Sequence, residues 1–305
     1  MLQEVFYWIF NMSITAALTG TLITLVRSVK KIPRRLSVFL WVIPFARMVF
    51  PVGLNSPYSL MSLLSKTATK FVTVYQPTDD MSFSMMNSVM AADTYFPITY
   101  KTNILEDIFN IASVVWLVGA LIILLILAVA YSAAFYEIKD SMHLRDNIYL
   151  SDKAFSPAVY GIVKPRIVLP ASYKNRDVEL VVLHETMHIQ SIDNLWRLSA
   201  FAIVAVHWFN PLCWLFLKLF LTDLELSCDE RVLAKLDDNN RAREYALALL
   251  ESKTDRTIFT SAFGGAKIRA RIENILSYKK LTIFSTAAFI VFIGIISHAL
   301  MTNAG

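Results

Sequence analysis

Three long runs without acidic or basic side chains restrict what this chain of 305 residues can fold into. Residues 5–26 and 108–131 contain no charged residue, and residues 281–301 contain only His298 as a titratable group. Each run reaches the roughly 20 residues that a helix needs to cross the hydrocarbon core of a bilayer. The first run also lacks the charged start and the small-residue cleavage site of a signal peptide. The sequence therefore predicts an integral membrane protein.

A fourth candidate span covers residues 36–54, where Pro44, Arg47 and Pro51 interrupt the apolar pattern. An arginine in lipid is costly, so Arg47 either faces other helices in a functional role or snorkels to a membrane face; we favour snorkelling. Charged residues make up 17% of the chain, against about 25% in a typical soluble domain. The low content of charged residues is consistent with a chain that has four membrane spans.

The charges between the spans predict the orientation. Residues 27–35 include five basic residues and no acidic one, so the positive-inside rule places this loop in the cytoplasm. Both termini and the loop at 55–107 are then outside, while residues 132–280 are cytoplasmic. Nine residues between two spans cannot dock a duplex, so we expect no direct nucleic-acid partner. The basic residues at 267–280, next to the last span, are expected to attract anionic membrane lipids.

A His-Glu-x-x-His motif lies in the cytoplasmic region, within a run at 179–188 that has helical periodicity. Residues four apart share one face of a helix, so His184 and His188 can direct their imidazoles at one metal ion. Glu185 projects beside that ion, where a carboxylate can take a proton from a metal-bound water. The alternative is a helix with two hydrogen-bonded histidines and a surface glutamate.

A second helix, predicted at residues 222–231, supplies the third ligand. Glu225 and Asp229 are again four apart, and a hydrolytic zinc site uses three protein ligands and one open position. Glu225 completes the set with the two histidines, and Asp229 is expected to hold the far nitrogen of a ligating histidine. A Glu-x-x-x-Asp motif after His-Glu-x-x-His is the gluzincin arrangement. The two motifs together predict a Zn²⁺-dependent hydrolase.

The segment between the motifs, residues 199–221, is apolar enough to be a span. A single crossing would put Glu225 on the opposite side of the membrane from the two histidines, so the segment must return on the side that it entered. Pro211 supplies the break for two short helices in or near the membrane surface. His207, near this break, is either a donor to a transition state or a polar residue at a helix end, which we favour.

Short β-prone runs precede the catalytic helix, at residues 148–151, 158–163 and 167–169. Packing beneath the catalytic helix explains the last run. Residues 158–163 have the position of the edge strand to which a gluzincin adds an extended peptide. Tyr245, in a helix predicted at 231–251, either stabilises an oxyanion or packs in the core, and we favour packing.

The predicted fold is mainly α, of the α+β class: a four-helix transmembrane domain with an inserted cytoplasmic, gluzincin-like zinc metallopeptidase domain. The predicted parts are a transmembrane helical hairpin at 1–54, an extracellular loop at 55–107, a third transmembrane helix at 108–131, the zinc domain at 132–280 with its membrane-associated segment at 199–221, and a fourth transmembrane helix at 281–301.

The chain resembles the BlaR/MecR-type antibiotic-sensor membrane metallopeptidases, a gluzincin family. The matching stretches are the two zinc motifs, the run Ser-Pro-x-x-x-Gly-x-x-x-Pro-x-x-x-x-Pro from Ser156, the stretch His207-Trp208-Phe209-Asn210-Pro211, and the order of spans around the zinc domain. The resemblance implies a signalling protease with His184, His188 and Glu225 as ligands and Glu185 as the base. The substrate is then the protein itself or a cytoplasmic repressor-like regulator.

The resemblance departs after Met301. Family members that sense β-lactams carry an external penicillin-binding domain there, with a Ser-x-x-Lys motif that does not follow in this sequence. A direct role in β-lactam binding is therefore not carried over.

The leading hypothesis is a membrane-embedded zinc endopeptidase in a regulatory pathway. The alternatives are a housekeeping gluzincin that trims membrane proteins and a non-catalytic transducer; the intact Glu185 argues against the transducer, because a relay needs no base. We also expect slow autocleavage near residues 257–266, within a homodimer. An ordinary surface loop is the alternative for that stretch.

Overall fold

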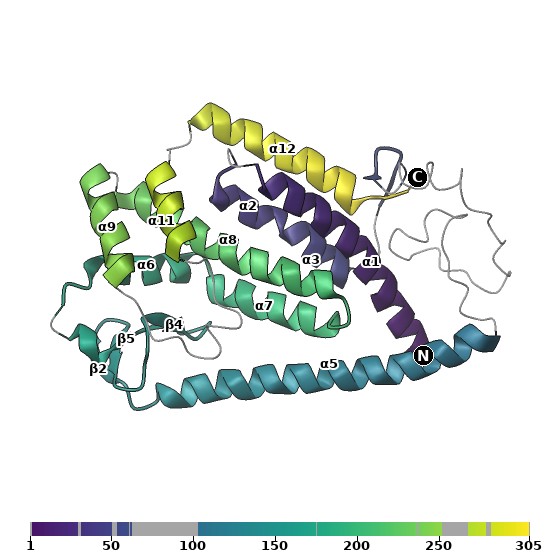
Figure 1. Ribbon diagram of the computed structural model, residues 1–305, viewed down its shortest axis with the longest axis horizontal. Helices are drawn as coiled ribbons and strands as arrows, with labels where there is room; N and C mark the ends of the chain where they lie inside the picture. Colours follow the sequence, from purple (N-terminus) through teal and green to yellow (C-terminus); the bar gives the residue numbers. More distant parts are fainter. Residues whose placement is uncertain are drawn as a thin grey trace.

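The computed structural model describes residues 2–29, 32–50, 54–60, 62, 103–174, 176–236, 238–251, 268–278 and 282–304. The described chain is mainly helical, with a small four-stranded mixed sheet and a short parallel pair of strands, β1 (Asn55–Ser56) and β6 (Asn303–Ala304) (Figure 1). Its helices are α1 (Leu2–Arg27), α2 (Arg34–Leu40), α3 (Val42–Val49), α5 (Asn103–Glu137), α6 (Glu179–Gln190), α7 (Asp193–Val206), α8 (Pro211–Leu236), α9 (Asn239–Glu251), α11 (Ile268–Ser277) and α12 (Ile283–Met301).

Three described helices are long and apolar enough to span a membrane: α1, residues Asp107–Tyr136 of α5, and α12. They coincide with the three uncharged runs. Most side chains of α5 and α12 in these windows are not buried against the rest of the protein, as expected for helices that face lipid.

The fourth expected span, residues 36–54, is not one continuous helix. It forms α2 and α3, which are separated at Trp41. Pro44 explains the interruption, because it has no N–H group to bond the carbonyl of Leu40, four residues earlier. The two short helices pack along α1 and α8 (Figure 1).

Arg47 on α3 is buried, with 2% of its surface exposed. Its guanidinium donates hydrogen bonds to the carbonyl oxygens of Leu300 (2.8 Å) and Thr302 (2.6 Å) at the end of α12. The last turn of a helix leaves such carbonyls without partners inside the helix, and Ser59 Oγ also donates to the Thr302 carbonyl at 2.7 Å. Arg47 therefore faces another helix, and the snorkelling interpretation was wrong.

The mixed sheet has the strand order β2-β3-β5-β4. Its strands are β2 (Met142–Arg145), β3 (Ile148–Ser151), β4 (Ala158–Tyr160) and β5 (Arg166–Pro170). Strands β3 and β5 are parallel and the other pairs antiparallel, so β4 is an edge strand. Ile148, Leu150, Ile167 and Leu169 are buried against apolar residues of α6, which confirms the expected packing beneath the catalytic helix.

Helices α7 and α8 form an antiparallel hairpin whose turn is at residues 207–210 (Figure 1). Asn210 accepts the N–H of Leu212 at 3.0 Å, and Pro211 occupies the first position of α8, where a proline needs no N–H partner. The chain thus reverses as expected. The prediction that both helices are short was wrong, because α8 continues without a break through Glu225 and Asp229 to Leu236.

The α1–α2 connection binds the face of α8 that points away from α6. Asp223, which is fully buried, accepts hydrogen bonds from Arg27 Nε (2.6 Å) and Trp41 Nε1 (2.9 Å). The Glu230 carboxylate accepts the first two backbone N–H groups of α2, at 2.9 and 3.1 Å. A carboxylate at a helix N-terminus is stabilising. The basic loop therefore fixes α8 in addition to any effect on orientation in the membrane.

The junction between α6 and α7 contains a strained residue. Ile192 has φ 56° and ψ 33°, the left-handed region, which a β-branched residue rarely adopts. This conformation turns the chain sharply, so that Asp193 points back at α6.

We expect Ile192→Asn to stabilise the protein by about 1 kcal/mol, because asparagine tolerates the left-handed region that costs other residues roughly 1–2 kcal/mol. The Ile192 side chain is 54% exposed, so little packing is lost. Thermal unfolding of the purified protein measures the effect, with Ile192→Val as the β-branched control. A melting temperature below that of the wild type would contradict this account.

Candidate metal centre

The two histidines of α6 converge as the motif predicted. His184 and His188 are 7% and 5% exposed, and their Nε2 atoms lie 3.2 Å apart. From α8, Glu225 places Oε2 3.8 Å from His184 Nε2 and Oε1 3.7 Å from His188 Nε2. Ligands at about 2.0–2.1 Å around a tetrahedral ion lie about 3.3 Å from one another. The three side chains thus fit a Zn²⁺ ion.

Glu225 is held as an anion. Burial alone would raise its pKa, but the charges of His188 and Arg197 and a hydrogen bond from His184 outweigh burial, so the pKa lies well below the ordinary glutamate value. Arg197, on α7, forms an ion pair with Oε1 of Glu225. An ionised carboxylate is the form that binds a metal.

Cys228 is a competing third ligand, because a donor atom of each of His184, His188 and Cys228 lies within 4.8 Å of the others. However, the Cys228 sulfur is 3.4 Å from Nδ1 of His184, on the side of the ring away from Nε2. Burial, aided by Glu225, raises the pKa of this thiol well above its ordinary value, whereas a metal binds the thiolate. Both observations favour Glu225.

Glu185 lies on α6 beside the ligands and is 7% exposed. Burial raises its pKa, the charge of His184 lowers it, and the charge of Glu225 raises it; the net change is upward. A carboxylate whose pKa is raised holds a proton more readily, which suits a group that must accept and return one.

Tyr245, on α9, links His184 to Asp229. Its hydroxyl donates to Asp229 Oδ1 at 2.6 Å and lies 2.8 Å from Nδ1 of His184. Since the hydroxyl proton goes to Asp229, the oxygen accepts Nδ1–H, which leaves Nε2 unprotonated for a metal. Asp229 itself is 3.6 Å from Nδ1, so Tyr245 stands between the histidine and the carboxylate that was predicted to hold it. Neither sequence-based interpretation of Tyr245 included this contact.

Asp193 orients the second histidine. Its Oδ2 lies 2.6 Å from Nδ1 of His188 and also accepts Nη2 of Arg231 at 2.9 Å. Asp193 was not predicted from the sequence. The sequence offers only an acidic residue five positions after His188, and its carboxylate reaches His188 because Ile192 adopts the left-handed conformation.

His207 lies at the opposite end of α7 from Asp193. It is 1% exposed, with Nε2 3.0 Å from the carbonyl oxygen of Met48. The transition-state role considered for it was therefore wrong, and the polar helix-end interpretation fits.

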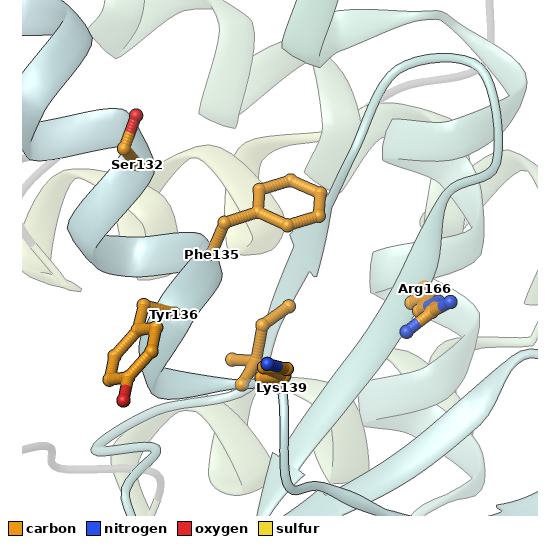
Figure 2. A pocket seen from close by; sticks show the side chains of 6 residues that line it. Ser132, Phe135, Tyr136, Lys139 and Arg166 are labelled. Atoms are coloured by element: carbon orange, nitrogen blue, oxygen red, sulfur yellow. The ribbon is translucent and has the colours of Figure 1, made fainter.

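A pocket of about 290 Å³ opens where the end of α5 meets β5 (Figure 2). Figure 2 shows Lys139 and Arg166 at this pocket together with Ser132, Phe135 and Tyr136. In the described part of the chain, the residues that line the pocket are not those of the metal centre.

We expect Glu225→Ala to lose bound zinc and Cys228→Ser to keep it. The glutamate supplies an ionised oxygen on the Nε2 side, whereas the thiol lies on the Nδ1 side. Elemental analysis of both purified variants provides the comparison. Full zinc in Glu225→Ala, or loss in Cys228→Ser with the fold intact, would reverse the assignment.

Tyr245→Phe is expected to weaken zinc binding by about 10–100-fold, the usual effect of removing a partner that orients a ligating histidine. Competition with a chelator measures the dissociation constant. Tyr149→Phe, which removes a hydroxyl on β3, is the matched control. Equal zinc affinity in the two variants would count against the link through Tyr245.

Comparison with known proteins identifies related sequences. The chain is 27% identical to the regulatory protein BlaR1 of Bacillus licheniformis over 156 residues, which is 48% of this chain and 26% of that protein. It is 30% identical to the methicillin resistance mecR1 protein of Staphylococcus aureus (strain Mu50) over 108 residues, 34% of this chain and 18% of that protein. The matches thus cover about a quarter or less of these two longer relatives.

A family model described as BlaR1 peptidase M56 matches residues 7–275, which include every residue of the metal centre. Because this match covers most of the chain, the chain belongs to the BlaR1 peptidase M56 family of metallopeptidases.

Proposed function

We propose that the chain is a membrane-embedded zinc endopeptidase that cleaves itself or a cytoplasmic regulator in a transmembrane signalling response. The convergence of His184, His188 and Glu225 from two helices, with Glu185 beside them, carries this proposal. The names of the relatives, a regulatory protein and a methicillin resistance protein, favour a regulatory role over housekeeping proteolysis.

A zinc ion held by His184, His188 and Glu225 would polarise the scissile carbonyl and increase the acidity of a water molecule. Glu185 would accept a proton from the water whose oxygen bonds to the carbonyl carbon, and would give that proton to the amine as the C–N bond breaks. Tyr245 and Asp193 lie against Nδ1 of the two histidines, so Nε2 is the nitrogen of each ring that would hold the ion.

The edge strand β4 is the proposed binding site for an extended substrate. β4 pairs with β5 on one edge, and it also lies near α6. The side-chain amide of Asn194 donates to the carbonyl oxygens of Val159 (2.9 Å) and Gly161 (3.2 Å), which fixes the edge relative to the metal centre. A peptide added to this edge places its carbonyl near the histidines.

We also propose that α2 and α3 together form the fourth crossing. Arg34, at the start of α2, contacts Glu230 near the metal centre. Arg47, near the end of α3, contacts the far end of α12. The pair thus runs beside α12, a helix that is long and apolar enough to span a membrane. In this proposed topology, the metal centre lies in the cytoplasm, residues 2 and 304 lie outside, and the cations of the pocket in Figure 2 lie near lipid headgroups.

We expect wild-type protein to cut itself slowly in or near residues 257–266, which lie outside the described residues. Glu185→Ala should keep zinc, since Glu185 is not a ligand, and lose cleavage by several orders of magnitude. Mass spectrometry of aged samples of both proteins provides the test. The same fragments from both would indicate a contaminating protease, and the proposal would fail.

A further inference from the structure

Arg271, on α11, reaches the metal centre from a part of the chain that carries neither zinc motif. Its Nε donates to Asp229 Oδ2 at 2.9 Å and its Nη2 donates to Asp229 Oδ1 at 2.6 Å. The side chain is 14% exposed. A two-point contact of this kind fixes the direction of a carboxylate as well as its charge.

The same guanidinium touches the rest of the centre. Nη2 lies 3.4 Å from the Tyr245 hydroxyl and 3.3 Å from Nε2 of His184, and Nη1 lies 3.7 Å from Oε2 of Glu225. Arg271 therefore contacts two of the proposed ligands, His184 and Glu225. It also contacts Tyr245 and Asp229, which together set the tautomer of His184.

Asp229 depends on this contact. It is fully buried, and within the described part of the chain Tyr245 and Arg271 donate hydrogen bonds to it. Without the arginine, a buried carboxylate would keep one hydroxyl donor and no cationic partner, which is strongly unfavourable. Oδ1 of Asp229 would then be able to turn away from Tyr245. The Tyr245 hydroxyl would no longer be oriented to accept Nδ1–H of His184.

Helix α11 has other contacts that hold it in place. Ile275 is buried in a cluster with Met187 and Val232, and Asn274 Nδ2 donates to the carbonyl oxygen of Leu226 at 3.3 Å. Replacing Arg271 is therefore expected to leave α11 docked, which separates the contribution of the guanidinium from that of the helix.

We propose that Arg271 is a positioning residue for proteolysis, which acts through Asp229 and Tyr245 on His184 and completes the metal centre when α11 is docked. The part that concerns proteolysis rests on the function proposed above. Arg197 and Arg231 neutralise Glu225 and Asp193 from α7 and α8. Arg271 comes instead from α11, the helix that precedes α12 in the chain.

The test compares Arg271→Ala and Arg271→Lys with Arg269→Ala in the full chain. Arg269 is the matched control, because it lies on the same helix, is 90% exposed at its side chain and pairs with Glu273. We expect Arg271→Ala to weaken zinc binding by about 10–100-fold, as measured by chelator competition. At saturating zinc, autocleavage should also be slower.

Arg271→Lys should restore zinc affinity only in part, since an ammonium cannot bind both oxygens of Asp229 in the same geometry. Added guanidinium ions should rescue Arg271→Ala and leave Arg269→Ala unchanged. Wild-type zinc affinity in Arg271→Ala would overturn the proposal. If Arg271→Ala does not fold, the zinc affinity of Arg271→Lys decides instead, and a wild-type value there also overturns it.

Zinc affinity and proteolysis are separate readouts. A wild-type protein that binds zinc, loses affinity on Arg271→Ala and cleaves nothing would refute the proposed function and leave the positioning role of Arg271 standing. The opposite result is a wild-type protein that cleaves itself and an Arg271→Ala variant with the same zinc affinity and the same rate of autocleavage. That result would support the proposed function and refute the positioning role of Arg271.

Discussion

The metal centre depends on how α8 is held between two partners. Asp223 and Glu225 are two residues apart, which places them about 160° apart around the helix. Asp223 and Glu230, seven apart, therefore face the α1–α2 connection, while Glu225 and Asp229 face α6. Because the buried carboxylates on both faces need their partners, α8 cannot rotate without losing contacts on both sides. The rotation of α8, and with it the position of Glu225, is therefore fixed by the α1–α2 connection together with α6.

The parts of the site that the sequence predicted are those with a fixed spacing on one helix. His184, His188 and Glu185 follow from helical periodicity, and Glu225 follows from the chemistry of a three-ligand zinc site. Asp193 was missed because its contact with His188 requires the left-handed conformation of Ile192, which no sequence pattern predicts. Arg271 was attributed to lipid attraction with its basic neighbours, since nothing in the sequence distinguishes a buried arginine from an exposed one.

The fold, too, was predicted where composition or spacing within one segment decides the structure, and not where contacts between segments decide it. The three uncharged runs specify long helices because length and composition alone decide whether a helix can span lipid. The interruption at Trp41 and the continuity of α8 depend on which backbone groups find partners. Strand β2 was missed because its four residues are all exposed, so no buried face produced an alternating pattern.

Tyr245 and Arg271 meet at Asp229 from α9 and α11, and these helices are joined through residues 252–267. In the intact chain, this tether gives the guanidinium a high effective concentration at the carboxylate. A single break between residues 252 and 267 would leave α11 and α12 as a separate piece, held to the rest of the protein by side-chain contacts. Arg271 could then leave at a rate set by its own dissociation. If the proposed autocleavage falls between residues 252 and 267, it would therefore limit how long Arg271 stays bound at Asp229 after the cut.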